Sequence, residues 1–458
     1  MIENDAFKLL LINLFHLNPD DIANILCTTF NKMMVLLVTL ADKHQACPYC
    51  GFTAPKIKEY VTKEITHSAL TTQKCIIKYR ARRYKCSCCG KTYYEFNPFV
   101  FKSQKISILT VHNILKDLKD FNETFTSVAR RYHVSPTSVS TIFDNHVDIG
   151  RNPLPEIINF DEVYAFKSEK SKYVCVLLDF KKQIPVDVLP NRKKEYLLNY
   201  FQKIPLEERK KVKYACSDMY EVYRDVVHKV FPSCCMLLDY FHLSQDFHRK
   251  MNEVRIKVMK GYKDNKASDE YYLLKKFNWL LFKNPEDEDK YGRLFDVERE
   301  RKYNSHFKSY MNYYDLRKKL LEINNDLTIC YSLKLELVDF YSKSTIDNAQ
   351  VNLEHLIRSF IDTNIEEMIK FSNNLINWKQ EIINSFTIVG TEYKVEADKG
   401  QVVVCNKKVN NAIIENRNKI IKCIKNNANG YTNWSRFRNR VMYVLDPNAT
   451  FSLEPREK

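Results

Sequence analysis

The stretch Ile157-Ile158-Asn159-Phe160-Asp161 is an apolar run that ends on a carboxylate, and it begins the part of the chain that decides the fold. It is the first of several short apolar runs separated by polar turn residues, a pattern that predicts strands. Strands are expected at residues 156–160, 172–180, 184–189, 212–217 and 235–238, and helices at residues 193–203 and 219–230. The sequence therefore predicts a meander of three strands followed by alternating helix and strand, which is a mixed α/β unit.

This unit is expected to bring two carboxylates together. Its element order is that of an RNase H-like α/β fold, in which the first and fourth strands are neighbours. Asp161 ends the first strand and Asp218, 57 residues later, ends the fourth, so both are expected at adjacent strand ends. A third carboxylate, Glu415, lies in a helical segment at residues 410–426. Carboxylates in such an arrangement can hold two Mg²⁺ or Mn²⁺ ions over a phosphodiester, which indicates phosphoryl transfer on nucleic acid.

These carboxylates also have simpler interpretations. Asp161 and Asp218 could be turn or helix-cap residues, which aspartate often is. Glu162 is an alternative to Asp161, although successive residues of a strand face opposite ways and only one of them normally enters a site. Glu415 could belong to a solvated helix face together with the lysines at i+4 and i+7.

Three other glutamates are alternatives to Glu415 as the third ligand, namely Glu354, Glu381 and Glu392. The first two lie in amphipathic helical stretches, and the last lies in a hairpin predicted near residues 386–404. Glu415 is preferred because its helix follows these segments and because Lys419 and Lys422 share its helix face, where they can meet DNA.

Two CxxCG motifs stand near the N-terminus, Cys47-Pro48-Tyr49-Cys50-Gly51 and Cys86-Ser87-Cys88-Cys89-Gly90. A CxxC turn presents two thiolates, and the glycine after it allows the tight backbone turn. Two such pairs predict one Zn²⁺ held by Cys47, Cys50, Cys86 and Cys89, with Cys88 as a minor alternative to Cys86. Four thiolates leave no open position on the metal, so this zinc would hold a zinc ribbon together and do no chemistry. Cys75, on a predicted strand between the motifs, is expected to pack in a core.

The charge of the chain indicates a polyanionic partner. The formal net charge is +16, and residues 43–105 hold 13 Lys or Arg against three acidic residues, a net charge of +10. Charge concentrated in this way predicts a nucleic-acid-binding face. Its candidate contact residues lie on one predicted strand between the cysteine pairs: Arg80, Arg82, Arg83 and Lys85.

Residues 126–144 predict a helix-turn-helix. The first short helix would bury Val128, Ala129 and Tyr132. After a brief turn, Ser135 would cap a second helix that begins at Pro136. The outward residues of that second helix are the candidates for contact with DNA, namely Thr137, Ser138 and Thr141. Two unrelated amphipathic helices can imitate this pattern, and its position after a basic zinc ribbon favours the DNA-binding interpretation.

Composition excludes several other classes of protein. The chain has 458 residues, too many for one ordinary domain, and its 45% hydrophobic residues are enough for packed cores. The acidic start Met1-Ile2-Glu3-Asn4-Asp5 does not match a secretory signal, and the apolar run at residues 33–40 is too short to span a membrane. Single cysteines in apolar runs fit a reducing compartment, so a cytoplasmic protein is expected.

Together these motifs resemble one family over nearly the whole chain, the DDE transposases of the ISL3 insertion-sequence group. The resemblance rests on the two CxxCG motifs, the helix-turn-helix, Asp161-Glu162, Ser217-Asp218 followed by Tyr220 and Tyr223, Asp239-Tyr240-Phe241-His242, and the block from Glu415 to Gly430-Tyr431. It implies that Asp161, Asp218 and Glu415 form the metal-binding triad. It also implies that Asp239 and His242 are an auxiliary motif beside the site and that Lys422 contacts DNA near the cut.

The resemblance also implies an activity. A transposase of this group would recognise the terminal inverted repeats of an insertion sequence, cleave the DNA there with Mg²⁺ or Mn²⁺ and transfer the strand to target DNA. Its partner would be double-stranded DNA, and it would act as a homodimer or larger homo-oligomer in the bacterial cytoplasm, on the nucleoid when bound and away from membranes. Two alternatives stay open: an RNase H-like nuclease without strand transfer, and a catalytically inactive DNA-binding regulator derived from a transposase.

The expected fold is a multidomain α/β protein whose catalytic domain is interrupted by an insertion. Its predicted parts, in order, are an N-terminal helical segment at 1–43, the zinc ribbon at 44–105, the helix-turn-helix at 106–150, the first part of the RNase H-like domain at 156–243, a mostly helical insertion at 244–400, and the second part with Glu415 at 401–458. The basic and aromatic residues at 431–440 are expected to lie along phosphates.

Overall fold

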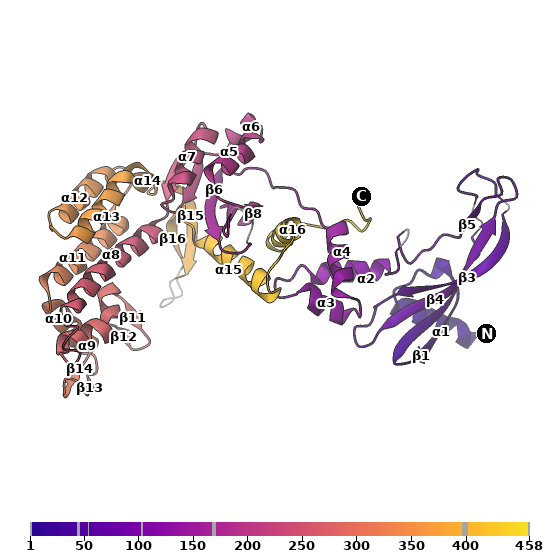
Figure 1. Cartoon of the computed structure of the whole chain (residues 1–458), viewed down its shortest axis with the longest axis horizontal. Helices are drawn as coiled ribbons and strands as arrows, with labels where there is room; N and C mark the ends of the chain where they lie inside the picture. Colours follow the sequence, from indigo (N-terminus) through magenta and orange to yellow (C-terminus); the bar gives the residue numbers. More distant parts are fainter. Residues whose placement is uncertain are drawn as a thin grey trace.

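The structure is a computed structural model that describes residues 2–43, 46–53, 55–101, 104–166, 171–395 and 402–456. Over these residues it is a mixed α/β protein with two five-stranded sheets and many helices. Figure 1 shows an elongated molecule with an N-terminal sheet at one end, a helix-rich region at the other, and a second sheet with α15 and α16 between them. No helix in the described ranges is long and apolar enough to cross a membrane.

The N-terminal sheet is covered on one face by α1 (Ile2–Leu14), which buries Leu11 and Ile12 against it together with Phe15 directly after the helix. The strands lie in the order β1-β2-β4-β3, and β5 also pairs with β4. They are β1 (Ile22–Phe30), β2 (Met33–Leu40), β3 (Lys56–Thr66), β4 (Cys75–Lys85) and β5 (Thr92–Tyr94), and a short 3₁₀ helix, η1 (Pro19–Asp21), precedes β1.

The prediction of a helical segment over residues 1–43 is correct only for α1 and wrong for β1 and β2. Asn31 and Lys32, between these two strands, both have positive φ, 47° and 60°. Two such residues in succession form the tight turn that matches the twist of an antiparallel hairpin. The flanking residues are largely apolar or β-branched and therefore fit a half-buried sheet.

Three helices follow the sheet: α2 (Ile108–Asp117), α3 (Phe125–Arg131) and α4 (Pro136–His146). The predicted start of α4 is confirmed, because the Ser135 hydroxyl accepts a hydrogen bond from the backbone N–H of Ser138 at 3.0 Å and Pro136 occupies the first turn. The residues predicted to be inward are buried. His133, at φ 54°, makes the turn between α3 and α4.

The central sheet has the order β10-β9-β6-β7-β8, as expected for the predicted strands. Its strands are β6 (Ile157–Val163), β7 (Val174–Asp179), β8 (Ile184–Leu189), β9 (Tyr214–Ser217) and β10 (Cys235–Leu238). β6 pairs antiparallel with β7 and parallel with β9. Unlike the prediction, β6 does not end at Asp161 but continues to Val163.

Helices cover both faces of this sheet. α5 (Lys194–Gln202) and α7 (Glu221–Val230) pack on one face against residues such as Ile158 and Phe160, and α6 (Leu206–Arg209) lies between them in sequence. α15 (Ala412–Asn427) and α16 (Trp434–Leu445) pack on the other face against Val176 and Val188. These two helices, from the C-terminal part of the chain, therefore cover the second face of the central sheet.

The region between Asp239 and residue 387 is mostly helical, as predicted, and has its own apolar core. Its helices are α8 (Tyr240–Lys260), α9 (Asp269–Lys276), η2 (Asn278–Phe282), α10 (Tyr313–Glu322), α11 (Asn325–Lys343), α12 (Ala349–Ile361), α13 (Glu366–Asn377) and α14 (Lys379–Asn384). Two small strand pairs were not predicted: β11 (Glu288–Asp289) with β12 (Gly292–Arg293), and β13 (Lys302–Asn304) with β14 (Ser309–Met311). The predicted hairpin near residues 386–404 is present as β15 (Ile388–Val395) and β16 (Val402–Lys408).

Candidate active site and cysteine cluster

The acidic candidate site lies at one edge of the central sheet. β6, β9 and β10 run parallel to one another, so their C-terminal ends meet at the same edge. Asp161 lies near the end of β6, Asp218 directly follows β9, and Asp239 directly follows β10. Glu415 reaches the same place from the first turn of α15. The structure thus brings together residues that are more than 250 positions apart in the sequence.

Two buried asparagines attach the start of α15 to β6. Asn159 Nδ2 donates to Asn411 Oδ1 at 2.6 Å and to the carbonyl oxygen of Asn410 at 2.8 Å. Asn411 Nδ2 in turn donates to the carbonyl oxygen of Phe160 at 3.3 Å. Asn159 and Asn411 are both fully buried. Because Asn411 is the N-cap residue of α15, these bonds place Glu415, one turn later, over the sheet edge.

Asp161 is bound to the same helix. Its Oδ2 accepts a hydrogen bond of 2.7 Å from Asn418 Nδ2, and its Oδ1 accepts one of 2.8 Å from the backbone N–H of Glu162. Asn418 is three residues after Glu415, so both project from one face of α15. Burial, with a smaller contribution from the nearby carboxylates of Glu162 and Asp218, raises the pKa of Asp161 to about 7, against the lowering effect of the Glu162 N–H.

Asp239, His242 and Glu415 form the tightest acidic group. One ligand atom from each can be chosen so that all three lie within 4.8 Å of one another. His242 Nε2 is 3.7 Å from Asp239 Oδ2 and 3.7 Å from Glu415 Oε1. Burial also raises the pKa of Asp218 and of Asp239, and His242 opposes this in both cases.

Several polar atoms of this site are buried without a hydrogen-bond partner among the described residues. They are Asp218 Oδ1, Asp239 Oδ2 and His242 Nε2. Buried polar atoms are almost always paired, so a group of unpaired atoms at one place indicates a missing ligand. Carboxylate oxygens together with an imidazole nitrogen suit a divalent cation such as Mg²⁺ or Mn²⁺. The donor atoms present therefore fit the metal that the sequence predicts.

Of the alternative ligands, Glu162 and Glu354 are paired with other residues. Glu162 forms an ion pair with Arg192 and accepts a hydrogen bond of 3.4 Å from the Tyr223 hydroxyl. Glu354 pairs with Lys379 on the surface of the helical region. Glu381 is buried on α14, and the side chain of Glu392 lies outside the described residues.

The site opens into a hollow of about 280 Å³, lined by Asp218, His242 and the start of α8 up to Arg249. Lys419 and Lys422 are exposed on the α15 helix that carries Glu415. A larger hollow of about 670 Å³ lies between α9 and the small strands β11 to β14 and contains none of the predicted site residues. The predicted site residues therefore lie at the smaller of these two hollows.

The four predicted zinc ligands form a second cluster. Cys47 Sγ lies 3.7 Å from Cys89 Sγ, and Cys50 Sγ lies 3.5 Å from Cys86 Sγ. All four sulfur atoms lie within 4.8 Å of one another. The backbone N–H of Cys89 points at the Cys86 sulfur and, ahead of the opposing effect of burial, lowers the pKa of that thiol to about 7. Cys88 is exposed and outside the cluster, and Cys75 is buried in the N-terminal core, so the structure favours Cys86 as the ligand.

The glycine after each cysteine pair has the predicted role. Gly51 and Gly90 have φ of 75° and 69°, the left-handed region that favours glycine. Their backbone N–H groups donate to the carbonyl oxygens of Cys47 and Cys86 at 2.8 and 3.0 Å. These two turns bring the sulfur atoms of each motif to one side.

The four basic candidates on β4 have different surroundings. Arg80 is exposed and lies over the Tyr60 ring at 4.9 Å, and Lys85 is exposed. Arg83 pairs with Glu59 at 2.7 Å. Arg82, in contrast, donates to Glu95 at 2.8 Å and to the carbonyl oxygens of Leu40 and Ala41, with only 14% of its side chain exposed. The structure therefore gives Arg82 a role in the fold and leaves Arg80 and Lys85 open to solvent.

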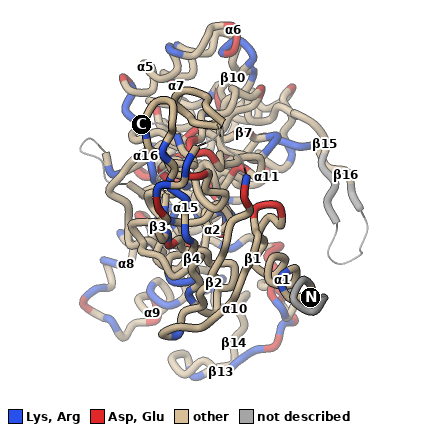
Figure 2. The backbone as a smooth tube through the Cα atoms, turned by 90° about the vertical axis from the view of Figure 1, so that its right-hand side faces the viewer, with Lys and Arg blue, Asp and Glu red and all other residues tan. Residues whose placement is uncertain are grey.

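The outward residues predicted on α4 lie where expected. Thr137 and Thr141 are exposed and Ser138 is half-buried, and they line a hollow of about 290 Å³ together with Gln104 and Lys105. Basic residues are also spread over other elements, among them α8, α9 and α15 (Figure 2).

The expectation that residues 431–440 lie along phosphates is wrong for their arginines. Arg436, Arg438 and Arg440 all bond to protein groups. A basic and aromatic stretch can therefore serve packing as well as DNA contact, and the sequence pattern does not separate the two.

Residues 158–397 match the family model of the ISL3-type DDE transposases, which is described as "Transposase". The chain belongs to this family. It is also similar to the transposase for insertion sequence element IS1001 of Bordetella parapertussis, with 19% identity over 409 residues that cover 89% of this chain and 90% of that protein. The matched segment of the family model contains Asp161, Asp218, Asp239 and His242, and Glu415 follows 18 residues after its end.

Proposed function

We propose that this transposase binds the terminal inverted repeats of its insertion sequence, cleaves the DNA at the ends in a metal-dependent reaction and transfers the cut strand to target DNA. Membership of the transposase family supports the overall activity. The observation that carries the cleavage step is the meeting of Asp239, His242 and Glu415, with Asp161 and Asp218 beside them, at one sheet edge.

The strand order supports an RNase H-like catalytic domain. The five strands of the central sheet lie side by side in the order β10-β9-β6-β7-β8. Successive strands β6, β7 and β8 are antiparallel, whereas β9 and β10 run parallel to β6. We retain the predicted layout of a zinc ribbon, a helix-turn-helix and a catalytic domain interrupted by a helical insertion. The N-terminal segment is revised to one helix followed by a strand hairpin of the first sheet.

The acidic residues have distinct proposed roles. Asp161, Asp218 and Glu415 would hold the catalytic Mg²⁺ or Mn²⁺, with Asp239 and His242 as auxiliary residues beside them. When bound, such ions activate an attacking water and stabilise the leaving 3′ oxygen. Asn418 orients the carboxylate of Asp161, and Asn159 and Asn411 hold the helix that delivers Glu415.

Recognition of DNA is proposed for the other half of the molecule. Cys47, Cys50, Cys86 and Cys89 would hold a structural Zn²⁺, which keeps β3 to β5 together. Arg80 and Lys85 would contact phosphates, and the exposed face of α4 with Thr137, Ser138 and Thr141 would contact the repeats. Lys422 would meet DNA near the cut. Because the element has two ends, we propose that two or more copies of the chain act together.

A cleavage assay on end DNA tests the proposal. Glu415→Gln removes a charged ligand and almost no volume, so we expect cleavage to fall at least about a thousandfold while affinity for the end is kept. Glu354→Gln is the matched control, since Glu354 is a paired surface glutamate of the helical region, and it should cut at the normal rate. A Glu415→Gln protein that still cuts would disprove the assignment.

The same assay separates the two alternatives. A nuclease without strand transfer would release cut ends that never become joined to a second DNA. A DNA-binding regulator would bind the ends but show no metal-dependent nicking, even as the wild-type protein. Joined products that require Mg²⁺ or Mn²⁺ are expected from a transposase.

A further inference from the structure

Residues 434–456, called the C-terminal bracket below, lie between the three helices α2 to α4 and the central sheet. The direct chain connection between these two regions, residues 147–156, contains no helix or strand. The bracket begins with α16 and forms a second connection, made by residues almost 300 positions further along the chain. It contacts both regions through hydrogen bonds and apolar packing.

One face of α16 is bonded to the three helices. Arg436 and Arg440 are four residues apart and therefore share a helix face. Arg436 Nη2 donates to Asp144 of α4 at 2.6 Å. Arg440 Nη2 donates to the carbonyl oxygens of Asp120 and Glu123, at 2.8 Å each, in the loop between α2 and α3.

The opposite face of α16 is bonded to the sheet region. Arg438, at i+2 from Arg436, points the other way. Its Nε donates to Asp187 of β8 at 2.7 Å, and its Nη1 donates to the carbonyl oxygen of Ile149 at 2.6 Å. Phe437 of α16 packs in the core formed by the sheet and α15. Three arginines on alternating faces of α16 thus connect the helices α2 to α4 with the central sheet.

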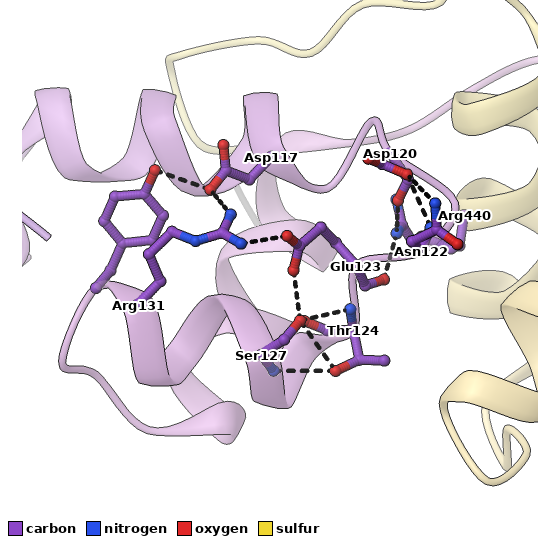
Figure 3. A network of polar contacts seen from close by, with 9 residues as sticks. Asp117, Asp120, Asn122, Glu123, Thr124, Ser127, Arg131 and Arg440 are labelled. Carbon is purple, nitrogen blue, oxygen red and sulfur yellow. Dashed lines mark hydrogen bonds and ion pairs between the residues drawn. The ribbon is translucent and has the colours of Figure 1, made fainter.

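The loop that receives Arg440 is itself held in place (Figure 3). Arg131 of α3 pairs with both Asp117 and Glu123, and Thr124 and Ser127 form a reciprocal capping box at the start of α3. Arg440 is only 1% exposed. A buried arginine bonded to a fixed loop transmits position, because neither partner can swing into solvent.

The rest of the bracket adds contacts to the same helices. Lys119 Nζ donates to the carbonyl oxygens of Asp446 and Ala449 at 2.8 and 2.6 Å. His146, the last residue of α4, bonds through Nδ1 to the carbonyl oxygen of Ser452 at 2.8 Å. Tyr443 lies in the apolar core of α2 to α4. The bracket is therefore part of the three-helix unit as well as of the sheet.

We propose that the C-terminal bracket is a spacer that sets which phosphodiester is cut relative to the sequence recognised by α4, with Arg436 and Arg440 as positioning residues. The inference rests on the proposed function. A shift of one base pair corresponds to roughly 3.4 Å along DNA. Arg151 and Asn152 are already bonded to the central-sheet region, so without the bracket only residues 147–150 could extend, over up to roughly 13 Å, about four such steps, whereas the bracket allows one separation.

The test measures where the DNA is cut as well as how much. On duplexes that carry one element end, Arg436→Asp and Arg440→Met should bind within about threefold of wild type. The wild-type chain should cut one phosphodiester, and each variant should spread cleavage over several neighbouring positions with a total about tenfold lower. The double variant Arg436→Asp with Asp144→Arg, which exchanges the two charges of this ion pair, should restore cleavage at the single wild-type phosphodiester.

A matched control separates positioning from general stability. Arg209 donates to the carbonyl oxygens of Ile204 and Val230, contacts of the same kind that stay within the catalytic region. Arg209→Met should lower the melting temperature without moving the cut. Arg436→Asp and Arg440→Met could also lose stability or activity while still cutting at the single wild-type position. In that case the proposed spacer role is wrong and the bracket only stabilises the fold.

A second measurement does not depend on cleavage. Small-angle scattering of the DNA-free chain should show a larger radius of gyration for Arg440→Met combined with Arg436→Asp than for wild type, because α16 would lose its bonds to α4 and to the loop between α2 and α3 and the remaining contacts of the bracket would hold α2 to α4 less rigidly. If the wild-type protein cuts no end DNA, the proposed function is wrong. The scattering measurement still tests whether the bracket holds α2 to α4 at a fixed distance from the central sheet. An unchanged radius of gyration in the double variant would overturn the proposal that the bracket is a spacer.

Discussion

The two candidate metal clusters of this protein are built in opposite ways. The cysteine cluster takes its four sulfur atoms from two tight turns, each closed by a glycine with positive φ. The acidic cluster takes its candidate ligands from the ends of three strands and from the helices α8 and α15. The first needs only two local turns brought together by one pair of strands. The second needs the whole central layer, so changes far from the ligands should affect it.

The largest expected effect concerns the cysteine cluster. Cys86→Ser should remove bound zinc and disorder β3 to β5, because a structural zinc site contributes on the order of 10 kcal/mol to folding. Elemental analysis of the purified protein should give one zinc per wild-type chain and none in the variant.

Cys88→Ser is the control for this prediction, since Cys88 is exposed and outside the cluster, and it should keep its zinc. If Cys86→Ser also unfolds the central sheet, the contrast between the two clusters is wrong, because their stabilities would then depend on each other.

The next effect distinguishes two arginines on β4. Arg82→Met removes the charged partner of the 5%-exposed Glu95 carboxylate and leaves it only the bond from the backbone N–H of residue 82, so it should cost about 3 kcal/mol of unfolding free energy. Arg80→Met should cost almost nothing in stability, because Arg80 is exposed. It should instead lower the slope of log affinity against log salt by roughly one for end DNA.

Denaturant melts and a salt titration of DNA binding test both variants. Equal stability losses, or a salt slope altered by Arg82→Met alone, would reverse the roles that we give to the two side chains.

The acidic cluster should respond to residues that carry no charge. Asn411→Ala removes the side-chain bonds with Asn159 and with the carbonyl oxygen of Phe160 that attach α15 to β6, and should cost about 2 kcal/mol. The expected result is a lower rate of metal-dependent cleavage, with zinc content and end binding unchanged. Asn426→Ala, near the exposed end of the same helix, is the control. Normal cleavage by Asn411→Ala would show that this attachment does not position Glu415.

A further effect is a dependence of stability on pH in Mg²⁺-free buffer. Burial raises the pKa of Asp161 to about 7 in the folded protein, from the ordinary aspartate pKa of 3.8. Between these values the unfolded chain has released a proton that the folded chain still holds. Folding stability should therefore fall as pH rises toward 7, by at most about 1.4 kcal/mol per pH unit for this group. Melting curves at pH 5 to 8 measure this.

Added Mg²⁺ should reverse the loss at pH 8 more than at pH 5, since the cation binds the ionised carboxylates. Asp161→Asn should flatten the dependence. A stability that rises with pH over the same range in the wild-type protein would contradict the burial of this carboxyl group.

The strands of the central sheet were predictable because each is a short apolar run between turn residues. The prediction failed at residues 22–40, where apolar character alone did not distinguish a hairpin from a helix. The signal was present in Asn31 and Lys32, whose positive φ makes the turn. Asn159, a polar residue within an apolar strand, was a similar signal for the site, since a buried amide requires a partner.

The sequence by itself determined the elements whose physics is local: the two cysteine turns, the capped start of α4, and the order of strands and helices in the central layer. Only the tertiary structure decided which charged groups are free. Arg82 and Arg440 resemble DNA-binding arginines in the sequence, yet each is bonded inside the protein. Glu415 reaches the acidic site because Asn411 attaches its helix to a strand 250 residues earlier. Long-range partners fix the environment of a charge, and adjacent residues do not reveal them.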